Sequence, residues 1–115
     1  LLESIPTAPN ASPHVTLALC ADDLFVSVMS YVFGLSQLGS HRCLLSVARL
    51  GEGVDEARRR RRVIVEATHE LGHGLGLTHC PVAHCAMHRT LWPEQIDLKR
   101  PEYCPSCLAQ LTLPP

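Results

Sequence analysis

Residues 66–85, EATHELGHGLGLTHCPVAHC, carry the pattern H-E-x-x-H-x-x-G-x-x-H, whose three histidines are His69, His73 and His79. On a helix, residues four positions apart lie one turn apart on the same face, so the first two imidazoles can hold one metal ion. Gly76 permits a left-handed turn after the helix, which brings the third imidazole to the same site. Three nitrogen ligands leave a fourth position open, an arrangement typical of catalytic zinc.

Glu70 lies between the first two histidines, where its carboxylate can reach a metal-bound water without binding the metal. Zinc lowers the pKa of its water towards ~7, which makes hydroxide available at neutral pH. Glu70 is therefore predicted to take the proton of that water as general base and to pass it to the leaving amine. The alternative is an ordinary helix with incidental histidines and a surface glutamate. The added glycine and third histidine argue against it.

Two short-spaced cysteine pairs follow the motif, Cys80 with Cys85 and Cys104 with Cys107. This layout suits a tetrahedral four-thiolate zinc site, which has no open position, so this second metal is predicted to be structural. It would tie the proline-rich C-terminal segment to the end of the histidine motif. Two disulfides are the alternative. We disfavour them because the sequence begins without a recognisable secretory signal.

The whole arrangement from His69 to Cys107, H-E-x-x-H-x-x-G-x-x-H-C-x4-C-x-M…C-x-x-C, resembles the archaemetzincins (archaelysins). These form a metzincin-type family of zinc peptidases, and the segments 22–24, 31–38 and 44–50 resemble them less specifically. The resemblance implies that Met87 forms the Met-turn beneath the catalytic metal, a role compatible with plain packing. It also implies two zinc ions per chain and a peptide or protein substrate.

Length and composition limit the remaining function classes. A chain of 115 residues with 46% hydrophobic residues suits one small domain with a real core. A net charge of −1 predicts no general attraction to nucleic acid or to an anionic membrane. No apolar run approaches the ~20 residues that cross a bilayer. Four zinc thiolates and two lone thiols, Cys20 and Cys43, favour a reducing cytoplasm, and a monomer is the favoured state.

The N-terminal half reads as three strands, at residues 14–20, 31–38 and 43–50. A short turn joins the last two, which favours an antiparallel pair. Gly34 interrupts the stretch from Tyr31 to Leu38 and indicates a bulge or a close backbone approach, which suits an edge strand. An extended peptide substrate could pair with such an edge above the zinc, so this strand is the suspected substrate-binding element.

A long helix is predicted from Glu56 to Gly74, with Asp55 as N-cap. Apolar residues at three- and four-residue spacings are expected to face the sheet: Val63, Ile64, Ala67, Leu71 and Leu75. Prolines keep the rest irregular up to a short helix at 106–111.

These elements predict an α+β fold of zincin or metzincin type, with a small mixed sheet, a long active-site helix and a zinc-stapled C-terminal part. We expect an N-terminal subdomain at 1–76 and a C-terminal subdomain at 77–115. Metzincin-like folds usually begin with a strand and a helix that are not found here. We therefore expect an N-terminal β-α unit to be missing, which makes the first subdomain partial.

Two other functions stay open beside a zinc metallopeptidase. One is a catalytically silent zinc-binding module that recognises peptides or proteins; the presence of Glu70 argues against it. The other is a nucleic-acid-associated zinc protein that uses the four cysteines and the run from Arg58 to Arg62. Such a run is more often a solvated helix end, and the overall charge is not basic.

Overall fold

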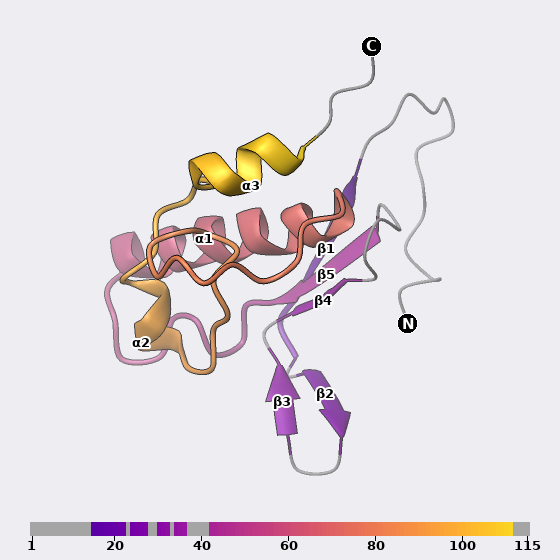
Figure 1. The fold of residues 1–115 in the computed structure, drawn as a ribbon. Coiled ribbons are helices and arrows are strands. Elements are labelled where there is room, and N and C mark those ends of the chain that lie inside the picture. Colours follow the sequence, from indigo (N-terminus) through magenta and orange to yellow (C-terminus); the bar gives the residue numbers. More distant parts are fainter. Residues whose placement is uncertain (1–14, 23, 28–29, 33, 37–41, 112–115) are drawn as a thin grey trace.

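A three-stranded mixed sheet supports the long helix in the computed structural model, which describes residues 15–22, 24–27, 30–32, 34–36 and 42–111. The strand order is β1 (Thr16–Cys20), β5 (Arg42–Ser46) and β4 (Gly34–Ser36). β1 runs parallel to β5, whereas β4 runs antiparallel to it, so the predicted antiparallel pair is confirmed and β4 is an edge of the described sheet. A separate hairpin of β2 (Leu24–Ser27) and β3 (Ser30–Val32) extends away from the helices (Figure 1).

The strand boundaries differ from the predicted ones. Parts of the predicted strand 31–38 form β3 and β4, whereas its positions 33, 37 and 38 lie outside the described residues. β2 is not among the predicted strands. The predicted strand 43–50 ends at Ser46, whose hydroxyl donates to the Asp22 carbonyl at 2.6 Å and accepts from the Ala48 N–H at 3.2 Å. A serine that bonds the backbone two residues later favours a turn, so the chain leaves the sheet at this point.

The helix α1 (Glu56–Gly74) has the predicted bounds because both of its ends carry strong local signals. The Asp55 carboxylate accepts the N–H of Arg58 at 2.8 Å, as an N-cap does. Gly76 has a φ of 102°, and its N–H and that of the next residue donate to carbonyls of the last helical turn at 3.0 and 2.8 Å. This Schellman ending confirms the predicted left-handed turn and sends the chain back along the helix.

The buried face of α1 is largely polar, which apolar spacing does not predict. Val65 packs in the core with Leu45 and Leu50, and each such buried side chain contributes about 1.5–3 kcal/mol. Ile64 and Leu75 stay 55% and 50% exposed, so their predicted orientation is wrong. The other buried positions of the helix are polar or glycine: Arg62, Glu66, His69, Glu70, Gly72 and Gly74. Packing partners for charged groups, rather than apolar periodicity, therefore set the orientation of this helix.

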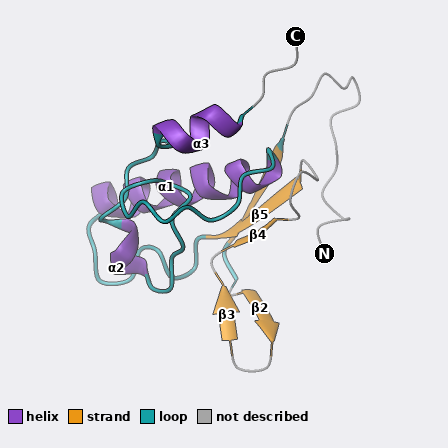
Figure 2. Ribbon diagram, viewed as in Figure 1, coloured by secondary structure: helices purple, strands orange, loops and turns teal. Residues whose placement is uncertain are grey.

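From residue 75 onwards the chain is mostly turns and loops around two short helices, α2 (Pro93–Ile96) and α3 (Pro105–Gln110) (Figure 2). α3 matches the predicted terminal helix within one residue at each end, whereas α2 is not among the predicted elements. A second buried cluster in this part gathers Leu77, Met87 and the four motif cysteines. The division of the chain at residue 76 stays a prediction. Among the described helices, none is both long and apolar enough to cross a membrane.

Candidate active site

The three motif histidines converge beside the C-terminal half of α1. His69 and His73 come from the helix, and His79 comes from the loop that follows its Schellman ending. The ring centroids are 4.7, 5.3 and 5.0 Å apart for the pairs 69–73, 69–79 and 73–79. One nitrogen of each ring lies within 4.8 Å of those of the other two. The structure thus brings together the imidazoles that the spacing singled out.

The hydrogen bonds of the two helical histidines fix which nitrogen faces the site. His69 Nδ1 lies 2.6 Å from the Ala86 carbonyl oxygen, and His73 Nδ1 lies 2.7 Å from that of Leu77. A carbonyl only accepts, so each Nδ1 carries the proton and each Nε2 of a neutral ring carries a lone pair. These Nε2 atoms are 3.1 Å apart. Two lone pairs facing each other repel unless a cation lies between them, so the donor set fits a metal ion.

Desolvation favours the neutral form of His69 and His79, which is the form that binds metal. Desolvation and the nearby Lys99 ammonium lower the pKa of His69 to about 3. Partial desolvation also lowers the pKa of His79, although this residue is exposed, and His73 contributes further. A ring that resists a proton at neutral pH keeps its lone pair available for a divalent ion.

Glu70 is held by the sheet from two sides. A Cβ added to Gly34 in β4 would lie 2.6 Å from both Cδ and Oε1 of Glu70, so the strand passes directly over the carboxylate. The predicted close backbone approach at Gly34 is thus confirmed. From β5, the thiol of Cys43 donates to the Glu70 carbonyl at 3.0 Å. This lone cysteine is a packed, fully buried thiol beside the site.

Met87 packs against α1 next to Gly72, and its role in a Met-turn stays a prediction. A Cβ added to Gly72 would collide with Met87 Sδ and would lie 3.1 Å from the Tyr103 ring. Met87 is fully buried, and the Tyr103 hydroxyl donates to the Thr68 carbonyl at 2.8 Å. Gly72, inside the H-E-x-x-H pattern, is therefore needed for the thioether to approach α1. The sequence offered no assignment for Tyr103, which packs the C-terminal segment onto the helix.

The four motif cysteines form a second cluster, and all of them are buried. Cys80 Sγ lies 3.7 Å from Cys104 Sγ, and Cys85 Sγ lies 3.8 Å from Cys107 Sγ. These distances exclude S–S bonds, which measure about 2.05 Å. Four sulfurs around one zinc, with Zn–S bonds of ~2.3 Å in a tetrahedron, would be separated by about 3.8 Å. The donor set and its spacing fit a zinc ion and do not fit the disulfide alternative.

Backbone N–H groups point at two of the four sulfurs, those of Cys85 and Cys104. The N–H groups of Met87 and Cys104 donate to Cys85 Sγ at 3.4 and 3.3 Å. A backbone hydrogen bond from Cys107 lowers the pKa of Cys104 to about 7, whereas desolvation raises the pKa of the Cys80 and Cys107 thiols. Donors aimed at a sulfur stabilise its anionic form, which is the form that binds metal.

A buried polar stripe runs along α1 towards the histidines, and sequence spacing gave no sign of it. Arg62 Nε and Nη2 donate to Asp97 at 3.0 and 2.8 Å, while Nη1 donates to the Leu50 carbonyl at 3.0 Å. One turn later, Glu66 accepts from Lys99 at 3.2 Å. The stripe ends at the histidine pair, so it connects the segment 86–100 to α1 beside the candidate active site.

The arginines of the run 58–62 differ in exposure and in partners. Arg62 is only 2% exposed in its ion pair, and Arg61 donates to the Lys99 carbonyl. Arg59 and Arg60 lie on the surface and contact Glu56 at 3.3 and 3.4 Å, pairs that are worth little in solvent. The run is thus not one continuous basic surface.

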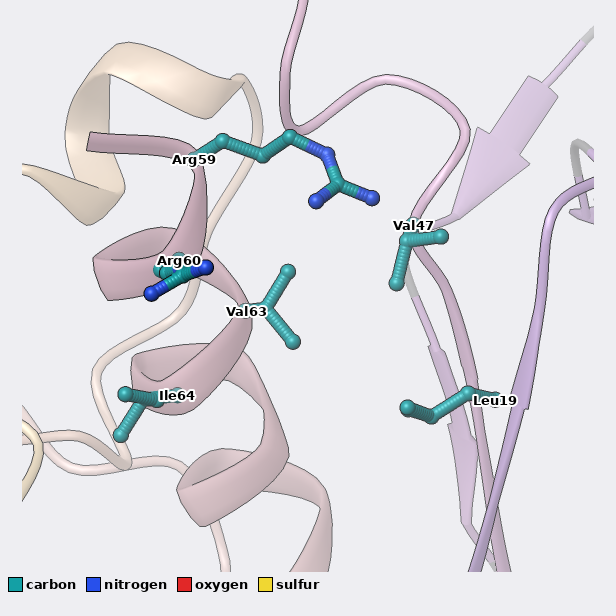
Figure 3. A pocket seen from close by; sticks show the side chains of 6 residues that line it. All are labelled: Leu19, Val47, Arg59, Arg60, Val63 and Ile64. Carbon is teal, nitrogen blue, oxygen red and sulfur yellow. The ribbon is translucent and has the colours of Figure 1, made fainter. Parts of the chain in front are cut away.

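A pocket of about 340 Å³ opens at the N-terminal half of α1, where Val63 points towards Leu19 and Val47 (Figure 3). Arg59, Arg60 and Ile64 complete its wall. None of the clustered histidines or cysteines lines it. This apolar pocket is therefore separate from the candidate active site.

Comparison with known sequences assigns the chain. The sequence pattern of peptidase family M54 matches residues 11–113, nearly the whole chain. The chain belongs to peptidase family M54. Proteins named archaemetzincin are similar to it: the one from Archaeoglobus fulgidus is 38% identical over 97 residues and that from Halobacterium salinarum 39% over 114. The resemblance inferred from the motif is confirmed.

Solved structures give the same fold. The crystal structure of archaemetzincin from Archaeoglobus fulgidus, complexed with malonate, superimposes with a TM-score of 0.83 at 36% identity, covering 95% of this chain and 65% of that one. Archaemetzincin from Methanopyrus kandleri gives a TM-score of 0.83 at 33% identity, with coverages of 96% and 58%. The two sequence matches above span 84% and 91% of this chain, but only 59% and 66% of the full length of those archaemetzincins. The predicted α+β, metzincin-like fold is thus confirmed.

Proposed function

We propose that this chain carries the catalytic centre of a zinc-dependent peptidase, with His69, His73 and His79 as metal ligands and Glu70 as general base. The observation that carries the proposal is the convergence of three imidazoles, two of them oriented by backbone carbonyls, beside a glutamate that the edge strand contacts. Membership of a family described as a peptidase family supports the reaction class.

A zinc ion held there would supply Lewis acidity for a scissile carbonyl and would acidify water. The chain's own contribution begins with the two carbonyls that hold Nδ1 of His69 and His73, which direct both Nε2 atoms into the site. Glu70 would accept the proton of the attacking water and deliver it to the nitrogen of the leaving amine. Its position against β4 keeps the carboxylate from swinging away between these two transfers.

The edge strand β4 is the proposed substrate-binding element. In the described sheet β4 pairs with β5, and Gly34 of β4 contacts Glu70. A peptide added along this edge would run past the carboxylate, bound mainly through backbone hydrogen bonds. Such binding predicts weak discrimination among substrate side chains.

The four cysteines would hold a second zinc ion with a structural task. The buried sulfur cluster includes Cys80, the neighbour of His79, and Cys85, two residues from Met87. Metal at this cluster would therefore fix the loop that supplies both His79 and Met87. Two zinc ions per chain follow from this proposal.

The test compares zinc-loaded wild type with Glu70→Gln on a mixed peptide library, with release of new amines as readout and metal content measured in parallel. Glutamine keeps the size of the side chain but cannot take a proton. We expect the variant to retain its zinc and to lose hydrolysis by ~10²-fold or more. Equal cleavage by both proteins would refute the role of Glu70. Absence of cleavage by a wild type that binds two zinc ions would favour the silent peptide-binding module.

A further inference from the structure

The only lysine of the sequence, Lys99, is buried next to the candidate active site. Its side chain is 1% exposed, and its ammonium donates to Glu66 Oε1 at 3.2 Å and to the Ala86 carbonyl at 3.3 Å. Thr90 donates to the same carboxylate oxygen at 3.0 Å. A buried lysine needs such partners, because an uncompensated charge inside a protein is costly.

The Ala86 carbonyl is a shared acceptor. Besides the Lys99 ammonium, it receives Nδ1–H of His69 at 2.6 Å. The other end of the same peptide group, the N–H of Met87, donates to Cys85 Sγ at 3.4 Å. One peptide plane thus touches a candidate catalytic ligand, a candidate structural ligand and the buried ion pair.

We propose that Lys99 is a positioning residue of the metal centre: with Glu66 it fixes the Ala86 carbonyl, which in turn holds His69 in its metal-binding orientation. This proposal rests on His69 being a metal ligand, as proposed above. The pair would act on the metal through the orientation of this carbonyl, which both Lys99 and His69 use as an acceptor.

The geometry separates this role from simple stabilisation. The Arg62–Asp97 pair lies on the same buried stripe of α1, one turn earlier, and ties the same segment to the helix. Its described hydrogen bonds reach Asp97 and Leu50 but not the Ala86 carbonyl. The Glu66–Lys99 pair therefore contacts the carbonyl that accepts from His69, whereas the Arg62–Asp97 pair does not. The Arg62–Asp97 pair is thus a matched control.

The experiment uses two double variants, Glu66→Leu with Lys99→Met and Arg62→Met with Asp97→Leu. Each removes a whole ion pair, so neither leaves one buried charge unpaired, and thermal unfolding verifies that both fold. With the cysteine site filled with zinc, the histidine site is titrated with cobalt(II) by its visible absorption, and zinc then competes for it. The Nδ1 proton of His69 is followed by NMR.

We expect removal of the Glu66–Lys99 pair to weaken metal binding at the histidines by about 10-fold and to shift the Nδ1 proton, since outer-sphere partners typically contribute 10–100-fold to affinity. The control should bind metal as the wild type does. Unchanged affinity in the first variant, or an equal loss in the control, would overturn the proposal. A wild type that binds no metal at the histidines overturns it together with the proposed function. A wild type that binds metal without hydrolysing peptides overturns only the function, because the titration still decides the role of Lys99.

Discussion

Gly34→Ala should disable catalysis while leaving the metal centre intact. The added Cβ would lie 2.6 Å from Cδ and Oε1 of Glu70, whereas ordinary contacts begin at 3.4 Å. The carboxylate must therefore move by about 0.8 Å, the difference between these distances. A misplacement of ~1 Å can cost about 10²-fold in rate, equivalent to ~2.7 kcal/mol of transition-state stabilisation. We expect kcat/KM on a library-derived peptide to fall by that factor.

Gly51→Ala is the matched control for this prediction. Its Cβ would also lie 2.6 Å from a side chain, in this case Cδ of the partly exposed Arg59, far along α1 from the histidines. Neither glycine has a positive φ, so the alanine backbone fits at both positions. The control should keep wild-type activity, and both variants should keep wild-type zinc content. Full activity of Gly34→Ala, or loss of activity accompanied by loss of zinc, would refute the reasoning.

Three further predictions concern stability and metal content. Gly72→Ala places a methyl group against Met87 Sδ and should lower the free energy of unfolding by ~1–3 kcal/mol in urea titrations. An unchanged free energy of unfolding would contradict the close packing of Met87 on Gly72. Cys107→Ser should reduce bound zinc from two ions to one by elemental analysis and lower the melting temperature, whereas two retained ions would rule out a four-cysteine site. Asp97→Asn should cost about 3 kcal/mol at neutral pH because it unpairs buried Arg62. Since Arg62 lowers the pKa of Asp97 below its ordinary value of 3.8, this difference from wild type should persist above that pH and shrink as the pH falls through the lowered pKa; a pH-independent difference would contradict the ion pair.

The sequence predicted best where short-range signals agree with the tertiary structure. Asp55 at one end and Gly76 at the other define α1, because a capping carboxylate and a left-handed glycine act through the backbone of their immediate neighbours. The histidine and cysteine clusters also follow from spacing, since a helix turn and two short loops leave the side chains little choice of direction. Gly34 was informative for the same reason: a glycine inside a strand pattern indicates that something approaches the backbone closely.

The parts that could not be predicted depend on partners far away in the chain. The strand β5 ends at Ser46 because the hydroxyl of this serine donates to the carbonyl of Asp22, 24 residues earlier. The buried face of α1 is polar because Asp97 and Lys99, more than 30 residues later, neutralise its charged groups. An argument from hydrophobic periodicity treats arginine and glutamate as exposed. It therefore predicts that the Ile64 side chain faces the sheet, and it gives no sign of the buried ion pairs.

Because Lys99 is buried, its chemical modification can report when the segment 86–100 detaches from α1. An amine-directed acylating reagent has no exposed lysine side chain to modify, since the sequence contains one lysine and its side chain is 1% exposed. Acylation of this residue therefore requires the segment 86–100 to detach from α1, and its rate measures the population of that detached form when reclosing is fast. Followed by mass spectrometry with and without metal, the rate would report how firmly each ion keeps the C-terminal segment in place.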